Sequence, residues 1–279
     1  MSEFRIDQIT NQAGTAGPDI AGITTFSGSS GLLMPRGDTF RRSVIEDVVE
    51  DGLVLYLDAG NDVSYPGSGT NWFDLSNNGN NGTLLNGVGY SASNGGSLTF
   101  DGVNDYASFT SNCYNVSLNG TINELTINAW IYWNSFPIDN IDEIVSWWET
   151  GSQTYSDGFL GVTCSANGGG TNTNPIIRFG DDWANTGASF TASTDVNKWW
   201  NITAVKTADN AYIYKNSTLS ATKGSALSWG FNNNLAIGRQ HGAGEYINAK
   251  IANIQLYNRA LSATEVSQNF NAIRSRYSI

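Results

Sequence analysis

The stretch from Gly52 to Phe109 constrains the fold of this chain more than any other. It opens with the apolar run LVLYL at residues 53–57, passes through a polar loop rich in Gly and Asn, and ends in two short apolar segments around residues 98–100 and 107–109. The tight turn DGVND, at residues 101–105, separates these two segments. Short apolar runs between clusters of turn residues are typical of β-strands, so the stretch predicts strands joined by loops and tight turns.

The rest of the chain continues the β pattern. On a strand, the side chains of residues 125–133 would point alternately to the two faces of the sheet. Large apolar groups occur on both faces, which predicts a central strand of a two-sheet sandwich. Composition agrees, because 31 Gly, 5 Pro and 12% aromatic residues fit many strands joined by tight turns. A chain of 279 residues can form one all-β domain of this kind. Further strands are predicted at residues 144–148, 159–164, 176–179, 199–206, 211–216, 235–238 and 251–257.

One helix is predicted near the C-terminus. Residues 262–265, SATE, form a capping box in which the side chains of Ser262 and Glu265 each bind the other's backbone amide. Val266, Phe270 and Ile273 then share one face of the helix, and we expect this stripe to pack on the edge of the sandwich.

The net charge and the absence of targeting signals in the sequence limit the classes of partner and the cellular location that we expect. The net charge of −11 argues against nucleic acid and anionic membranes, because an acidic surface repels phosphate groups. No apolar run approaches the length of a transmembrane helix, and the N-terminus lacks the basic and then apolar layout of a signal peptide. We therefore expect synthesis in a cytosol without export by the general secretory route. Cys113 and Cys164 show no metal-ligand spacing and are expected to be reduced thiols.

Several motifs between Gly52 and about Phe270 resemble laminin-G-like members of the concanavalin A-like lectin/glucanase superfamily. They are GLVLYLDAGN at 52–61, FDG at 100–102 followed by Asp105-Tyr106, residues 125–131, residues 199–205, and Ile237-Gly238-Arg239 followed by residues 251–261. The resemblance implies an all-β fold, a concanavalin A-like jelly-roll sandwich of two antiparallel sheets, one convex and one concave. An extended N-terminal arm, residues 1–43, and the short C-terminal helix complete the architecture, with residues 44–279 forming the jelly-roll domain.

Residues 1–43 differ from the rest of the chain. Gly, Ser and Thr separate short pairs of apolar residues, and these pairs follow neither the helical nor the strand periodicity. Because such a segment cannot bury much of its own surface, alone it is expected to be extended or disordered. Its apolar content exceeds that of a plain linker, and we favour an anchoring arm ordered against another protein over a flexible leader. The residues expected to anchor it are Phe4, Ile6, Ile9, Ile20, Ile23, Phe26, Leu32 and Leu33.

The N-terminal segment carries a second, shorter resemblance. Residues 4–28, FRIDQITNQAGTAGPDIAGITTFSG, are similar to leaders on structural proteins of tailed bacteriophages, particularly those of marine cyanobacteria. This resemblance implies a protein made in the host cytoplasm and located in the virion, as a capsid decoration, neck or tail appendage. Other virion proteins would then be the partners of the arm. A homo-oligomer is compatible with such an appendage, although the sequence carries no signal for one.

No catalytic constellation is apparent in the sequence. Glucanases of the superfamily carry Glu-x-Asp-x-x-Glu on a strand, where paired carboxylates act as nucleophile and acid, and this chain lacks the motif. Glu143, Glu149 and Glu245 are isolated in sequence, and the single histidine, His241, is accompanied by no activated-serine motif. We therefore predict that the chain is not an enzyme.

A calcium site is the next alternative. Many laminin-G-like domains hold calcium, and the resemblance places an Asp ligand near the last strand. Here Ala252 occupies the matching position, which argues against calcium. Asp101 and Asp105 are expected to bind nearby backbone amides rather than a metal. We therefore predict no cofactor.

Sugar binding is the main alternative to a purely structural role. Carbohydrate sites stack aromatic rings on sugar rings, with Asn, Asp and Gln around them. Trp147 and Trp148 are adjacent, so on a strand one of them faces the core and the other faces away from it. The predicted carbohydrate-binding residues are Trp147, Trp148, Tyr155, Asp181, Asp182 and Trp183.

Two functions therefore stay open. The first is a non-enzymatic phage virion structural protein, anchored by its arm, that displays a lectin-like jelly roll as a decoration or fibre protein. The second is a carbohydrate-binding adhesin that recognises host-surface polysaccharide with the same domain. The two are compatible with each other, and a glycoside hydrolase is a distant third.

Overall fold

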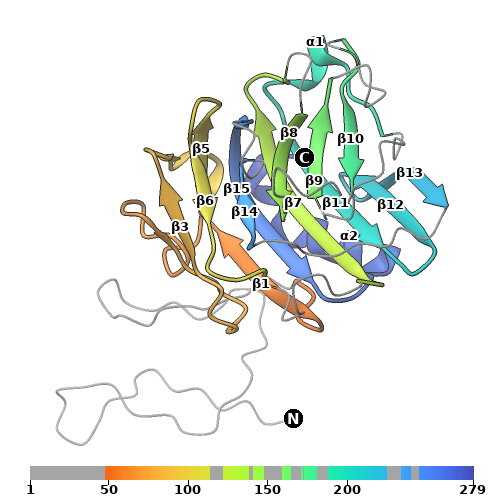
Figure 1. Cartoon of the computed structure of the whole chain (residues 1–279), viewed down its shortest axis with the longest axis horizontal. Helices are drawn as coiled ribbons and strands as arrows, with labels where there is room; N and C mark the ends of the chain where they lie inside the picture. Colours follow the sequence, from red (N-terminus) through yellow and green to blue (C-terminus); the bar gives the residue numbers. More distant parts are fainter. Residues whose placement is uncertain are drawn as a thin grey trace, which may run out of the picture. The chain divides into compact units, whose positions relative to one another are not determined.

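The protein is described here by a computed structural model, and the described residues form a sandwich of two antiparallel β-sheets (Figure 1). They all belong to one unit, residues 43–279. The all-β jelly-roll prediction is confirmed, whereas the predicted arm, residues 1–43, lies outside the described residues. The structure describes residues 48–113, 122–137, 141–147, 159–164, 171, 173–180, 188–224, 234–239 and 245–279.

Sheet A has eight strands, seven of which follow the order β13-β12-β11-β7-β15-β5-β4. The eighth, β1, pairs with the C-terminal half of β15, while β5 pairs with its N-terminal half. The strands are β1 (Leu53–Asp58), β4 (Gly89–Ser91), β5 (Ser97–Asp101), β7 (Leu125–Trp133), β11 (Trp199–Lys206), β12 (Asn210–Lys215), β13 (Thr218–Gly224) and β15 (Asn248–Tyr257).

Sheet B has seven strands in the order β10-β9-β8-β14-β6-β3-β2. They are β2 (Asn71–Trp72), β3 (Gly82–Leu85), β6 (Tyr106–Ser108), β8 (Ile141–Ser146), β9 (Phe159–Thr163), β10 (Ile176–Phe179) and β14 (Ala236–Ile237). The described helices are the short η1 (Ser93–Gly95) and α1 (Ala192–Asp195), the longer α2 (Ala263–Ile273), and η3 (Arg274–Tyr277). None of these helices could span a membrane.

The inner core lies between the two sheets, and β7 is at its centre. Alternate residues of β7, from Leu125 to Trp133, belong to the inner core, while Trp130 points to the opposite face and joins a second apolar cluster. Because β11 and β15 flank β7 on both sides, the prediction of a central strand with two buried faces is confirmed.

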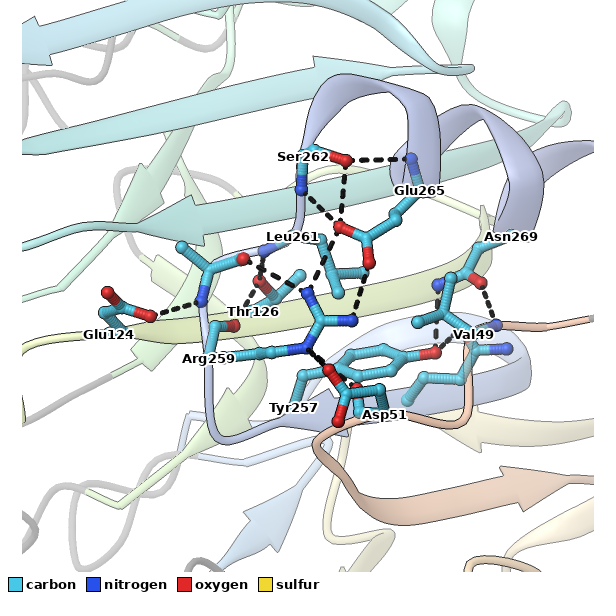
Figure 2. A network of polar contacts seen from close by, with 12 residues as sticks. Val49, Asp51, Glu124, Thr126, Tyr257, Arg259, Leu261, Ser262, Glu265 and Asn269 are labelled. Carbon is cyan, nitrogen blue, oxygen red and sulfur yellow. Dashed lines mark hydrogen bonds and ion pairs between the residues drawn. The ribbon is translucent and has the colours of Figure 1, made fainter.

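Helix α2 covers the outer face of sheet A. The capping box is present: the Ser262 hydroxyl accepts from the Glu265 amide at 3.3 Å, and the Glu265 carboxylate accepts from the Ser262 amide at 2.8 Å (Figure 2). The ring of Phe270 stacks on Trp130 with centroids 5.6 Å apart. The expected apolar stripe is buried, but the expectation that it packs on the sandwich edge is wrong, because Trp130 projects from the sheet's face.

The end of the chain is tied to β1 by an ion pair. Two guanidinium nitrogens of Arg276, in η3, donate to the Asp58 carboxylate at 2.7 and 3.0 Å. The Asp58 side chain is only 3% exposed and the Arg276 side chain 14%. A carboxylate buried to this degree depends on its partner, so the pair fastens the C-terminus to sheet A.

Replacing Arg276 should destabilise the fold more than replacing its exposed neighbour. We expect Arg276→Met to lower the free energy of unfolding by about 3 kcal/mol, because Asp58 would stay buried without its partner. Urea denaturation would measure this, with Arg274→Met as the control on the exposed side of the same turn. Equal effects of the two substitutions would contradict the structural role of the pair.

Candidate functional site

The structure places Trp147, one of the predicted sugar-binding residues, in the inner core. Its side chain is fully buried, and its indole N–H donates to the Asn112 carbonyl at 2.8 Å. A sugar cannot stack on this ring while the core is packed, so the expectation of a ligand contact is wrong for Trp147. The physical reason is the one that makes adjacent strand residues point to opposite sides.

The remaining predicted site residues lie outside the described residues. The described chain stops at Trp147 after β8 and at Gly180 after β10, and strand pairing puts these two points at the same end of sheet B, through Ser146 with Phe159 and Leu160 with Phe179. The segments that carry the predicted aromatic and acidic residues therefore adjoin the same end of sheet B, on strands that both pair with β9. These residues are Trp148, Tyr155, Asp181, Asp182 and Trp183, and the arm residues Phe4, Ile6, Ile9, Ile20, Ile23, Phe26, Leu32 and Leu33 also lie outside.

The outer face of sheet B gathers polar and aromatic side chains. Ile177 and Val162 pack in the inner core, so the next pairing along the strands, which joins Glu143, Gly161 and Arg178, faces outward. A side chain at Gly161 would place its Cβ 2.5 Å from the Asp142 carbonyl oxygen, so only glycine fits between the two charged residues. Glu143 and Arg178 thus flank a position without a side chain.

An arginine and two tyrosines form the best-defined part of this face. The guanidinium carbon of Arg239 lies 3.7 Å from the centroid of the Tyr106 ring, a cation–π contact. The backbone of Tyr246 forms an isolated antiparallel β-bridge with that of Arg239. The centroid of the Tyr246 ring is 6.3 Å from that of the Tyr106 ring. All three side chains are half-buried. We call Tyr106, Arg239 and Tyr246 the Tyr-Arg cluster.

The sequence predictions did not include the Tyr-Arg cluster in a site. Tyr106 and Arg239 belong to motifs that carry the family resemblance, but they are more than a hundred positions apart in the chain. Their meeting depends on the pairing of β6 with β14, a long-range contact without a local signal. The half-buried cluster offers ring faces and a guanidinium group, whereas Glu143 on the same sheet face is buried, at 1% exposed.

Two neighbouring carboxyl groups on β8 point to opposite faces of the sheet. Glu143 faces outward, whereas Asp142 pairs with Val162 on the inner side. Burial, and secondly the charge of Glu245, raise the pKa of Asp142 to about 8. Groups on opposite faces of a strand cannot flank one scissile bond, so Asp142 and Glu143 do not form a hydrolytic pair.

The Asp101–Asp105 turn serves the architecture. The Asp101 carboxylate accepts from the backbone amides of Val103 at 2.8 Å and Asn104 at 3.3 Å, which confirms the predicted turn bonding. These amides, that of Val103 first, lower the pKa of Asp101. Ala252 is fully buried and offers no side-chain oxygen. The described residues hold no group of three or more His, Cys, Asp or Glu that could bind a metal, so they do not fit a carboxylate-bound calcium.

The cysteines behave as core residues. Cys113 and Cys164 are both buried and neither is in a disulfide, as expected for reduced thiols. Burial raises the pKa of the Cys113 thiol to about 12, so this group is protonated at neutral pH and is a poor nucleophile. The predicted loop histidine, His241, lies outside the described residues.

Solved structures with the same fold come from enzymes and from binding domains. Trypanosoma rangeli sialidase in complex with sialic acid matches with a TM-score of 0.56 and 17% identity, over 82% of this chain and 34% of the sialidase. The binding domain of Paraclostridial mosquitocidal protein 1 matches with a TM-score of 0.57 and 16% identity, over 80% of this chain and 52% of that domain. The receptor-binding domain of botulinum neurotoxin type G matches with a TM-score of 0.54 and 16% identity, over 79% of this chain and 51% of that domain.

These similarities concern the fold alone. The chain spans about a third of the sialidase and about half of each toxin domain. No curated protein sequence matches it. A family model described as the concanavalin A-like lectin/glucanases superfamily, of the laminin G type, matches residues 100–267, more than half of the chain. With two antiparallel sheets in jelly-roll arrangement and this match, the chain belongs to the concanavalin A-like lectin/glucanase superfamily.

Proposed function

We propose that this chain is a non-enzymatic structural protein of a tailed-bacteriophage virion, in which residues 1–43 attach to the particle and the jelly roll is displayed. The observation that carries the proposal is the firm seating of the chain just after the arm. Val48 and Val49 are 4% and 7% exposed, in the same apolar cluster as α2. A segment fixed in this way suits a domain held through its N-terminus. The resemblance of residues 4–28 to phage leaders supplies the setting.

Attachment should depend on the apolar residues of the arm. We expect the full chain with Ile6, Ile9, Ile20 and Ile23 replaced by Ser to bind purified particles at least tenfold less than the unaltered chain, because the anchoring contacts would be lost. Co-sedimentation with particles that lack the protein would measure this. The same number of Ser substitutions at exposed positions of the jelly roll is the control. Unchanged co-sedimentation of the arm variant would overturn the proposed attachment.

The second candidate is a carbohydrate-binding adhesin, and the Tyr-Arg cluster is the observation that favours it. Half-buried tyrosine rings beside a guanidinium group can combine ring stacking with directional hydrogen bonds, as polar ligands with apolar faces require. The fold does not choose between the candidates, because its structural neighbours include both an enzyme and toxin binding domains.

A glycan array probed with the full chain would test this candidate. We expect binding to host-surface polysaccharide, and we expect Tyr106→Ala and Arg239→Met each to weaken it about tenfold. Tyr90→Ala is the matched control, since Tyr90 is 38% exposed on β4 at the edge of the other sheet. Absence of binding above background, or equal loss in the control, would remove the Tyr-Arg cluster as a sugar site.

A glycoside hydrolase has the least support. The raised pKa of Asp142 is of the kind that a catalytic general acid has. Its side chain, however, lies on the inner side of sheet B, where a polysaccharide cannot reach it. A buried neutral carboxyl that stabilises the fold at low pH is the simpler role. Turnover of a polysaccharide that is abolished by changing Glu143 would revive the catalytic alternative.

The pH dependence of stability should reveal this role of Asp142. Its folded-state pKa of about 8 exceeds its ordinary value of 3.8, so the folded state binds the extra proton between these values and loses stability as pH rises from about 4 to 8. Asp142→Asn should therefore raise the melting temperature by several degrees at pH 8, at roughly 2–4 °C per kcal/mol, and change it little at pH 4. Asp62→Asn, at an exposed carboxylate, is the control. A lower melting temperature for Asp142→Asn at pH 8 would contradict the assignment.

A further inference from the structure

Residues 48–51, which precede Gly52 and β1, are packed more firmly than a lead-in segment needs to be. Val48 and Val49 are buried beside α2, whereas Glu50 and Asp51 are exposed. Figure 2 shows Val49 beside Asn269, a residue of α2, and Asp51 beside Arg259, which follows β15. We call residues 48–51 the junction segment, because it connects the arm with the jelly roll.

Asn269 holds the main chain of the junction segment. The Val49 amide donates to the Asn269 side-chain oxygen at 2.8 Å, and the Asn269 side-chain nitrogen donates to the Tyr257 hydroxyl at 2.9 Å. Asn269 is 1% exposed inside α2, where Asn is an unfavourable residue for helix formation. A role in binding the junction segment explains why a buried helical position carries an amide.

Arg259 provides the second hold. Its Nε donates to the Asp51 carbonyl at 2.9 Å and lies 2.9 Å from the Asp51 carboxylate. The rest of its guanidinium binds the Glu265 carboxylate of the capping box at 2.6 and 3.1 Å. The hydrogen bond from Arg259 is the main cause that lowers the pKa of Glu265 to about 2, so this carboxylate stays ionised above acidic pH.

Glycine at position 52 lets the junction segment approach Arg259. Gly52 has φ of +76°, and a Cβ there would lie 2.9 Å from the Cγ of Arg259. Backbone strain and steric overlap would both oppose any other residue. The sequence thus has a glycine at the position where the chain turns from the Arg259 contact into β1, so that the Asn269 and Arg259 contacts can form together.

We propose that the junction segment is a latch: Asn269 and Arg259 hold residues 48–51 on α2, and their release lengthens the arm while the sandwich stays folded. The proposal rests on the proposed function, in which the arm is a tether. The segment is held by a few hydrogen bonds, one exposed ion pair and the burial of Val48 and Val49 against α2, so its opening breaks far fewer contacts than unfolding of the sandwich does. The inner core contains none of the residues involved. Four released residues extend the tether by about 14 Å.

Hydrogen exchange in the full chain tests the latch. In Asn269→Leu, a variant of similar size without the acceptor, we expect the Val49 amide to exchange at least tenfold faster and the amides of β7 to keep their rates. Asn271→Leu is the matched control, since Asn271 is the exposed asparagine of the same helix. Its Val49 amide should exchange as in the unaltered chain.

Two results would overturn the latch. One is an unchanged Val49 amide in Asn269→Leu, and the other is equal acceleration of Val49 and β7, which would mean that the segment opens only with the whole domain. If Asn269→Leu does not fold, Val48→Ala with Val49→Ala weakens the same contact from the other side, and must show the same selective acceleration. These measurements need no particle, so their failure is distinguishable from a failure of arm-dependent attachment.

Discussion

The pairing of β15 with β7 is the contact on which the rest of the structure depends. It joins residues 249–257 to residues 126–133 in the middle of sheet A, and β15 also carries β1 and β5 end to end along its other edge. The N-terminal stretch from Gly52 to Phe109 therefore has no complete sheet until the last strand of the chain is in place. This arrangement makes most stabilising contacts non-local, a property associated with slow folding. It also brings the two ends of the domain together, which is why the junction segment can reach α2.

Polar side chains fill part of the space between sheet A and α2. Asn128 accepts hydrogen bonds from Asn201 and Thr203 at 2.8 and 2.6 Å and donates to Gln255 at 3.1 Å, all in the buried interior. The Tyr257 hydroxyl, 3.4 Å from Gln255, connects this network to Asn269 and so to Val49. An apolar layer would hold the helix as well, but it would not select one position along the sheet. The network makes the placement of α2 and of the junction segment specific.

The sequence predicted features whose cause is local and missed those whose cause is distant. The capping box at Ser262, the Asp101 turn and the alternation of β7 are set by neighbouring residues, and each is confirmed. The side of the sandwich that α2 covers could not be predicted, because it depends on Trp130 pointing outward from a strand far away in sequence. Trp147 and Trp148 show how far prediction from local sequence reaches. Alternation predicts that only one of them faces the core, but identifying Trp147 as that residue requires the position of its strand.

The two outer faces of the sandwich differ in composition, and this difference bears on where we propose that a ligand binds. The outer face of sheet A is occupied by α2, η3 and the junction segment, whose aromatic and aliphatic side chains close it from solvent. On the outer face of sheet B, charged residues and half-buried rings take the positions that α2 covers on the other sheet. Burying an arginine and a glutamate in a sheet face costs stability unless their polar groups are engaged, whereas aliphatic residues there would carry no such cost. Glu143 and Arg178 are 1% and 3% exposed, so their burial requires that their polar groups be engaged within the fold, and the half-buried Tyr-Arg cluster is the part of this face for which we propose recognition.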